Sequence, residues 1–352
     1  MRPASALLFP LAALAVFLPH APLFHLPYFW DELGYYIPAA LDFFERGLLV
    51  PRSTPPNVHP PGLTLWLALV WKTAGYSIAA TRCGMLLLAS AAVVVVYLLA
   101  RELTRGSRAA APLAALLLLL SPLFFTQAML AQIDLPALLL FSLALLLFLR
   151  ERIHAAALAC GALVLVRETG VVAPLVFALW LAVERRRREA LLFLAPAALL
   201  GAWLAGLHFA TQEWFGDDEF ARFNVLFPLH PVRLPVALAR RVSFLFVENF
   251  HWVGTAAIAW AAARTPLFGT RAWRVTLATA VAMTLAVTVL GGAVLERYLL
   301  PVLPVFYIAA AAALATWRRV WASAGAWVLA TGLLVSHSAG PLLLPAPFEN
   351  NL

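Results

Sequence analysis

Apolar runs recur along the whole chain, and most have the length that a helix needs to cross a bilayer. Nine of them occupy residues 4–24, 79–100, 109–127, 135–150, 190–209, 242–263, 275–293, 299–316 and 320–338. Hydrophobic residues make up 63% of the 352 residues and charged residues 12%, and the mean hydropathy is +0.88. These values are far from those of a water-soluble domain. The sequence therefore predicts an all-α polytopic membrane protein.

Two further apolar stretches do not fit a single straight span. The stretch 154–183 is too long for one helix, and the polar residues 167–170 interrupt it, which predicts two short helices, 154–166 and 170–183, joined by a hinge. The stretch 62–76 is too short to cross, which predicts an interfacial or re-entrant helix.

The distribution of arginine sets the expected orientation, because cytoplasmic loops are rich in Arg and Lys. With the N-terminus inside, the internal segments hold 15 of the 25 basic residues and four of the 17 acidic residues. These segments are Arg2 and residues 101–108, 150–154, 184–189, 264–274 and 317–319. We expect about eleven spans in one transmembrane domain over 1–352, with external loops at 25–78, which carries interfacial helices, and at 210–241.

This orientation places a set of polar residues at the external ends of the predicted helices. They are Asp31, Glu32, His59, Asp134, Arg167, Glu168, Glu296, Arg297 and Tyr298. Polar side chains at membrane depth are costly and tend to be functional. Their placement on one side predicts a single extracytoplasmic cavity.

Several other kinds of site are not indicated. The chain has no Gly-rich phosphate loop and no Asp-x-Asp pair, and its basic residues form no face that would bind nucleic acid. Cys83 and Cys160 lie in apolar segments, so neither a disulfide nor a zinc site is expected. Residues 217–219 are acidic, but we interpret them as a solvated loop. No metal site is predicted, and a divalent metal as cofactor stays open.

An ordered set of motifs resembles a known enzyme family. The set comprises Asp31-Glu32 after the first helix, His59-Pro60-Pro61, Arg82, Ile133-Asp134-Leu135-Pro136, the hinge at Arg167 and Glu296-Arg297-Tyr298-Leu299-Leu300-Pro301. Over about residues 1–316 it resembles the protein O-mannosyltransferase and lipid A aminoarabinose transferase group of C-type glycosyltransferases. That resemblance implies an integral enzyme of the bacterial inner membrane. Such an enzyme takes a sugar from a polyprenyl-phosphate carrier on the extracytoplasmic face and inverts the anomeric centre.

The chemistry of such a transfer suits these residues. It needs one base to take the proton of the acceptor hydroxyl, and cations to stabilise the departing phosphate. The resemblance implies that Asp31 is the catalytic base and Asp134 the second acid, and Glu32 would orient Asp31, raise its basicity or bind acceptor. The basic residue ahead of the Pro pair, often lysine in the family, is His59 here. Substrate or phosphate contacts are expected from His59, Arg167, Glu168, Arg297 and Tyr298.

Each assignment has a structural alternative. Asp31 and Asp134 could simply cap the helices that follow them. Arg167 and Glu168 could form an ion pair that satisfies the hinge, and Arg297 could extend along its helix toward the membrane surface.

Two other functions use the same features. A transporter or lipid flippase would use the external charges as a substrate path, although no internal repeat supports this reading. A non-catalytic scaffold would not need the charges to cluster. The acceptor could be a lipid, a glycan or a protein.

Overall fold

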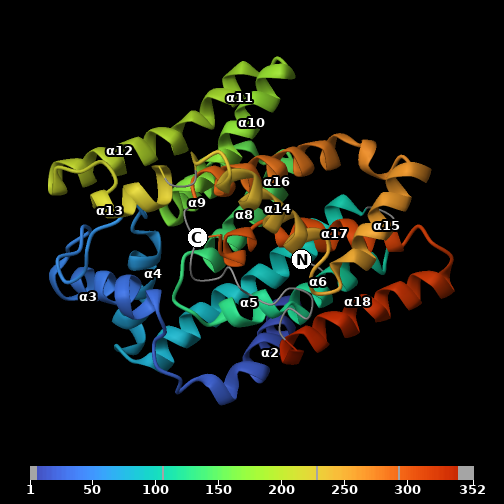
Figure 1. Cartoon of the computed structure of the whole chain (residues 1–352), viewed down its shortest axis with the longest axis horizontal. Helices are drawn as coiled ribbons and strands as arrows, with labels where there is room; N and C mark the ends of the chain where they lie inside the picture. Colours follow the sequence, from blue (N-terminus) through green and yellow to red (C-terminus); the bar gives the residue numbers. More distant parts are fainter. Residues whose placement is uncertain (1–5, 105–106, 227–228, 292–293, 340–352) are drawn as a thin grey trace.

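The computed structural model describes residues 6–104, 107–226, 229–291 and 294–339, which form helices joined by loops, with no strand among them (Figure 1). The α-helices are α2 (Leu8–His20), α3 (Ile37–Arg46), α4 (Gly62–Ala74), α5 (Ile78–Leu103), α6 (Ala110–Leu120), α7 (Pro122–Ala128), α8 (Asp134–Leu149), α9 (Ile153–Val166), α10 (Val172–Val183), α11 (Arg187–Leu192), α12 (Leu194–Thr211), α13 (Asp218–Ala221), α14 (Arg233–Phe246), α15 (His251–Arg264), α16 (Arg271–Val289), α17 (Leu303–Leu314) and α18 (Arg319–Ala339). Short 3₁₀ or π turns are η1 (Ala21–Leu23), η2 (Glu32–Tyr36), η3 (Glu168–Val171), η4 (Arg222–Leu226), η6 (Leu267–Gly269) and η7 (Glu296–Leu299).

The centre of the bundle is built from α5, α8 and α17, with α12 and α18 along opposite sides (Figure 1). Every residue of α17 is buried, and its run of five alanines, 309–313, lets neighbouring helices approach closely. The long helix α5 packs against α2, α6 and α8, and α8 packs in turn against α9. The predicted all-α membrane fold is confirmed by this arrangement.

Four helices of the described residues are long and apolar enough to cross a membrane, and the number rises to six if each of two bent pairs is one span. The four are Ile78–Leu103, Arg187–Thr211, Arg271–Val289 and Arg319–His337. Five shorter apolar helices, of 10–17 residues, occupy Leu8–Leu23, Asp134–Leu149, Ile153–Val166, Glu168–Val183 and Leu303–Leu314. The total of eleven spans stays a prediction.

The expected hinge is present, but two of the expected straight spans, 109–127 and 242–263, are broken; the run 109–127 is split between α6 and α7, which are bent by 66°. Helix α9 ends at Val166, Arg167 is extended, and α10 follows η3, as the sequence predicts. The run 242–263, by contrast, is split between α14 and α15, which are bent by 86°. Asn249 and Phe250 at this break have positive φ angles of 50° and 63°, which no α-helix accommodates. The expected external loop 210–241 also contains α13, η4 and the first half of α14.

The segment 25–78, predicted to be an external loop, contains the two short helices α3 and α4. Asp42 on α3 holds the segment between them by accepting hydrogen bonds from the backbone N–H groups of Arg52 at 2.6 Å and Ser53 at 2.8 Å. Burial alone would raise the pKa of the Asp42 carboxyl. The two N–H groups and Arg46 lower this pKa by more than burial raises it, so the pKa of Asp42 is below its ordinary value.

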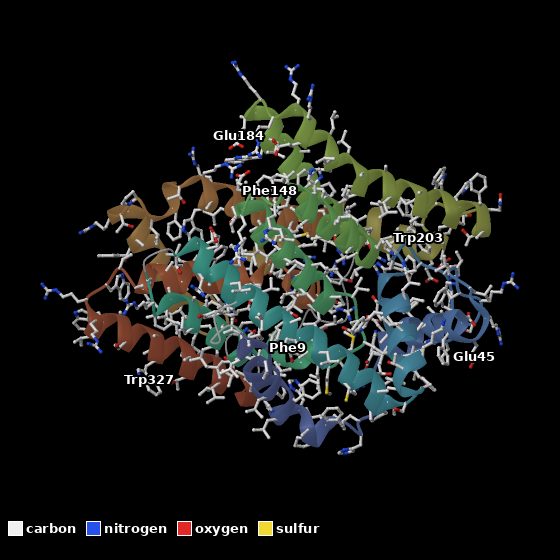
Figure 2. The ribbon with its side chains drawn as sticks, turned by 180° about the vertical axis from the view of Figure 1, so that it is seen from behind. Phe9, Glu45, Phe148, Glu184, Trp203 and Trp327 are labelled. Atoms are coloured by element: carbon white, nitrogen blue, oxygen red, sulfur yellow. The ribbon has the colours of Figure 1, made fainter. Side chains whose placement is uncertain are left out.

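Segments that the sequence places on the cytoplasmic side meet at one end of the bundle. Arg271 contacts Glu184 at 2.6 Å and Glu151 at 3.0 Å, and Arg186 contacts Glu151 at 2.8 Å. Figure 2 labels Glu184 in this cluster, and Trp327 on the outer surface of α18. The contacts join the predicted internal segments 150–154, 184–189 and 264–274.

We expect this cluster to face the cytoplasm. With Cys83 and Cys160 replaced by alanine, a cysteine at Asp218 should react with a membrane-impermeant maleimide in intact cells, because α13 lies at the opposite end of the bundle. A cysteine at Arg187, beside the cluster, should react only after permeabilisation. The reverse pattern would place the polar pocket described below on the cytoplasmic face.

Candidate active site

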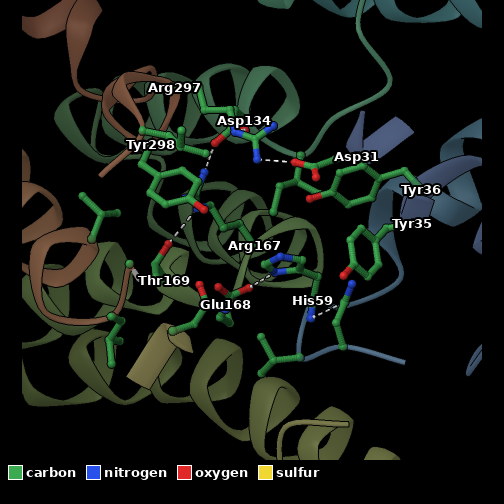
Figure 3. Close-up of a pocket in the computed structure, with 18 of the residues that line it drawn as sticks. Asp31, Tyr35, Tyr36, His59, Asp134, Arg167, Glu168, Thr169, Arg297 and Tyr298 are labelled. Carbon is green, nitrogen blue, oxygen red and sulfur yellow. Dashed lines mark hydrogen bonds and ion pairs between the residues drawn. The ribbon is translucent and has the colours of Figure 1, made fainter. Parts of the chain in front are cut away.

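Seven of the nine polar residues singled out in the sequence line one pocket at the end of the bundle opposite the cluster around Arg271, and Glu32 and Glu296 do not line it. Its volume is about 280 Å³. Figure 3 shows its charged and aromatic wall. The lining residues include Asp31, Tyr35, Tyr36, His59, Asp134, Arg167, Glu168, Arg297 and Tyr298. The predicted convergence of these segments is therefore present, although they lie up to 267 residues apart in the chain.

Asp31 points into the pocket and forms an ion pair with Arg297 (Figure 3). Both side chains are 16% exposed. Asp31 precedes the π turn η2, has helical dihedral angles and makes no capping hydrogen bond through its side chain. A short π-helical turn often marks a functional position. In the structure Asp31 therefore does not cap a helix through its side chain, and Arg297 points to Asp31 and not to the membrane surface.

Asp134 joins two arginines that come from distant segments. One carboxylate oxygen pairs with Arg167, and the other lies 3.7 Å from the Nε atom of Arg297. Arg167 also donates from Nε to the hydroxyl of Thr169 at 3.0 Å. Asp134 is the first residue of α8, directly after the N-cap residue Ile133, and its carboxylate contacts these two arginines. Arg167 pairs with Asp134 rather than with its neighbour in sequence.

Glu168 pairs instead with His59, whose Nδ1 atom lies 2.8 Å from a carboxylate oxygen. The two are brought together because α4 begins directly against the end of α9. A Cβ atom on Gly62 would lie 2.5 Å from the carbonyl oxygen of Leu165, so only glycine permits this approach. The glycine after the Pro pair thus sets the position of His59 against the hinge.

Tyr298 provides an aromatic face for three cations. The guanidinium carbon of Arg167 lies 4.7 Å from the ring centroid, and those of Arg241 and Arg297 each lie 5.7 Å from it. Arginine over an aromatic face is stabilised by the ring quadrupole. The ring therefore keeps three like charges close to one wall of the pocket.

Arg241 is a residue that the sequence analysis missed. Its side chain is 2% exposed, and none of its three guanidinium nitrogens has a hydrogen-bond partner among the described residues. Its Nη2 atom lies 3.0 Å from where a Cβ of Gly291 would be, and Gly291 lines the pocket without a side chain.

Glu32 does not lie in the pocket. Its carboxylate is fully buried, pairs with Arg82 and accepts the backbone N–H groups of Ala131 at 2.7 Å and Phe29 at 3.0 Å. Arg82 in turn donates to the carbonyl oxygens of Met129 and Pro27. Of the roles expected for Glu32, orienting Asp31 is the one that this position allows.

Metal ligation has little support from the geometry. Among the described residues, no group of three His, Cys, Asp or Glu side chains could hold a metal ion. Asp217 caps α13 by accepting the backbone N–H of Glu219 at 3.4 Å.

We expect Gly62→Ala to destabilise the protein by about 1–3 kcal/mol, because the new methyl group must displace either the backbone at Leu165 or the start of α4. The thermal unfolding midpoint of the purified variant measures this effect. Gly201→Ala on α12 is the matched control, since nothing lies within 4 Å of its Cβ position. Equal midpoints for the two variants would contradict the close approach.

A family model and solved structures both match the chain. Residues 58–213 match the model described as dolichyl-phosphate-mannose-protein mannosyltransferase. This stretch contains His59, Asp134, Arg167 and Glu168. A search of curated protein sequences gives no significant match.

Two of the three similar structures contain a lipid-carrier phosphate. The crystal structure of ArnT from Cupriavidus metallidurans bound to undecaprenyl phosphate has a TM-score of 0.68 at 21% identity, covering 99% of this chain and 67% of that one. The same protein in the apo state has a TM-score of 0.62 at 19% identity, covering 91% and 61%. The archaeal oligosaccharyltransferase AglB from Archaeoglobus fulgidus, in complex with an inhibitory peptide and a dolichol-phosphate, has a TM-score of 0.59 at 15% identity, covering 94% and 55%.

At these identities the likeness shows the fold. The chain has the C-type glycosyltransferase fold that its motifs suggested, and the family-model match in its middle part supports a glycosyltransferase.

Proposed function

We propose that the chain is an inverting membrane glycosyltransferase that moves a sugar from a polyprenyl-phosphate carrier to an extracytoplasmic acceptor. The native location would be the bacterial inner membrane, with the pocket on the extracytoplasmic face. The acceptor would be a lipid, a glycan or a protein. The fold shared with proteins whose structures hold undecaprenyl phosphate or dolichol-phosphate supports this class of donor.

The observation that carries the proposal is a buried arginine, Arg241, that takes no part in the ion pairs of the pocket. Each pocket acid has a basic partner: Asp31 has Arg297, Asp134 has Arg167, and Glu168 has His59. Arg241 stands behind the wall, and none of its guanidinium nitrogens has a hydrogen-bond partner in the described part of the chain, although Glu296 acts on it through space. A buried unpaired guanidinium is costly, and an anion beside it would remove that cost. A lipid-linked phosphate is the anion that the shared fold suggests.

The apolar part of the pocket suits such a carrier. Val287, Leu290 and Leu295 line the pocket together with Gly291 and Tyr298. A phosphate held by the arginines around Tyr298 would have this apolar wall beside it for the first carbons of the prenyl chain. The sugar would then lie between the arginines and Asp31.

The transfer itself requires one bond to form and one to break. The acceptor oxygen attacks the anomeric carbon while its proton passes to the Asp31 carboxylate, and the bond from that carbon to the phosphate oxygen breaks. The electron pair leaves with the phosphate, whose growing charge Arg297 and its neighbours stabilise. The phosphate and Asp31 compete for the same guanidinium of Arg297. A bound carrier therefore weakens the ion pair of Asp31 with Arg297 and leaves the Asp31 carboxylate available to accept the proton.

We expect Asp31→Asn to lower transfer by about 10²–10⁴-fold, since the amide keeps the shape of the side chain but accepts no proton. Donor binding should persist, because the carboxylate that competes for Arg297 is gone. Asp31→Glu should recover little activity, since the longer side chain misplaces the carboxylate. The assay is transfer of labelled sugar from polyprenyl-phosphate to acceptors in native-host membranes.

Two results of that assay would reject parts of the proposal. Near-normal transfer by a folded Asp31→Asn variant would move the base to Asp134, because Glu32 is buried away from the pocket. Transfer by the wild-type protein from a sugar nucleotide in carrier-free detergent would reject the donor class.

We expect Arg241→Met to raise the thermal unfolding midpoint of the lipid-free protein, because it removes a buried charge without a partner. The same variant should lose most of the stabilisation that undecaprenyl phosphate gives to the wild type, since ligand stabilisation follows affinity. Thermal unfolding with and without this lipid measures both effects.

Arg240→Met is the matched control, because Arg240 is the neighbouring residue on α14 and is less buried than Arg241. It should keep the wild-type response to undecaprenyl phosphate. A full lipid response in Arg241→Met would show that the phosphate does not rely on this arginine.

A further inference from the structure

Trp30, directly before Asp31, has a backbone conformation that tryptophan rarely adopts. Its φ angle is +44°, in the left-handed region that favours glycine. The turn around it is closed twice: the backbone N–H of Glu32 donates to the carbonyl oxygen of Phe29 at 3.0 Å, and the N–H of Phe29 donates to the Glu32 carboxylate at 3.0 Å. Strain of this kind costs about 1–3 kcal/mol and persists where the surroundings impose it.

The buried pair of Glu32 and Arg82 imposes it here. The Glu32 carboxylate that closes the turn is also held by Arg82 from α5 and by the backbone N–H of Ala131. The two charged side chains are 0% and 1% exposed, so breaking their contacts would leave a charge buried without a partner. The turn can therefore relax only if this part of the protein is rearranged.

The strained turn exposes a large aromatic ring at the pocket. Trp30 is 76% exposed and lines the same cavity as Asp31. Aromatic side chains near a membrane surface often serve only as interfacial anchors. Phe29 and Leu33, which are 65% and 63% exposed, can provide that contact, but neither lines the pocket. Anchoring alone thus gives no reason to hold Trp30 in a strained conformation against the cavity.

We propose that the indole of Trp30 is the platform on which a sugar ring of the acceptor stacks, so that the acceptor is a glycan or a glycolipid. This inference rests on the proposed function and names its acceptor class. The face of an aromatic ring is electronegative and attracts the C–H groups on one face of a sugar ring. A ring held on Trp30 presents its hydroxyls to the adjacent Asp31.

The test uses Trp30→Gly, because glycine adopts the positive φ angle without strain and the turn stays closed. Labelled polyprenyl-phosphate sugars are supplied to native-host membranes with the wild-type or variant protein, and transfer is followed over a dilution series of acceptor. Trp30→Gly should raise the acceptor concentration at half-maximal rate by about tenfold, while Trp30→Phe stays close to the wild type. The thermal shift caused by undecaprenyl phosphate should be the same in all three proteins.

Phe29→Ala is the control, since Phe29 is a neighbouring exposed aromatic outside the pocket. The proposal is supported if Phe29→Ala leaves the acceptor dependence unchanged and if the wild-type product resists protease. If Phe29→Ala changes the acceptor dependence as much as Trp30→Gly does, Trp30 is only a membrane anchor. If protease releases the label from the wild-type product, the acceptor is a protein. Either result overturns the proposal. Absence of label with the wild-type protein would reject the proposed function itself, and this inference with it.

Discussion

The buried ion pair between Glu32 and Arg82 is the interaction on which the geometry of the pocket depends. It connects the segment before η2, the start of α5 and the loop before α8 through four hydrogen bonds to neighbouring backbone groups. Asp31 directly precedes Glu32, and Asp134 lies three residues after Ala131. One ion pair therefore helps to fix the positions of Asp31 and Asp134, two of the three pocket acids. Removing either Glu32 or Arg82 would leave the other charge buried without its partner, so the two residues stabilise this region only together.

The sequence predicted the charged residues of the site, because a charged side chain at membrane depth costs free energy unless it has a function or a partner. Asp31, Asp134, Arg167 and Arg297 are charged residues beside apolar runs, where an unused charge would not be tolerated, and all four line one pocket. The hinge could also be predicted, because an apolar stretch twice the length of a short helix contained a polar interruption.

The remaining features depend on tertiary contacts that no spacing reveals. Whether Asp31 or its neighbour Glu32 enters the pocket is decided by the π turn η2 and by Arg82, 50 residues further along the chain. The break between α14 and α15 depends on two residues with positive φ, one of which, Phe250, packs where Gly332 has no side chain. That break was missed because residues 242–263 are apolar enough to read as one helix. Arg241 was missed with it, as it lies at the edge of the same run.

The two ends of the bundle differ in how their charges are satisfied, and this difference points to the end where a ligand is needed. At the Arg271 cluster the acids and bases contact each other and remain partly exposed, with side chains of Arg186, Arg271 and Glu184 between 28% and 33% exposed. Water can complete any hydrogen bond that these groups lack. Arg241 at the other end is 2% exposed, so water cannot do the same there. Burying a cation without a hydrogen-bonded acid costs free energy. Either the rest of the fold compensates for this cost, or a bound anion removes it, and a bound anion is what a binding site would provide.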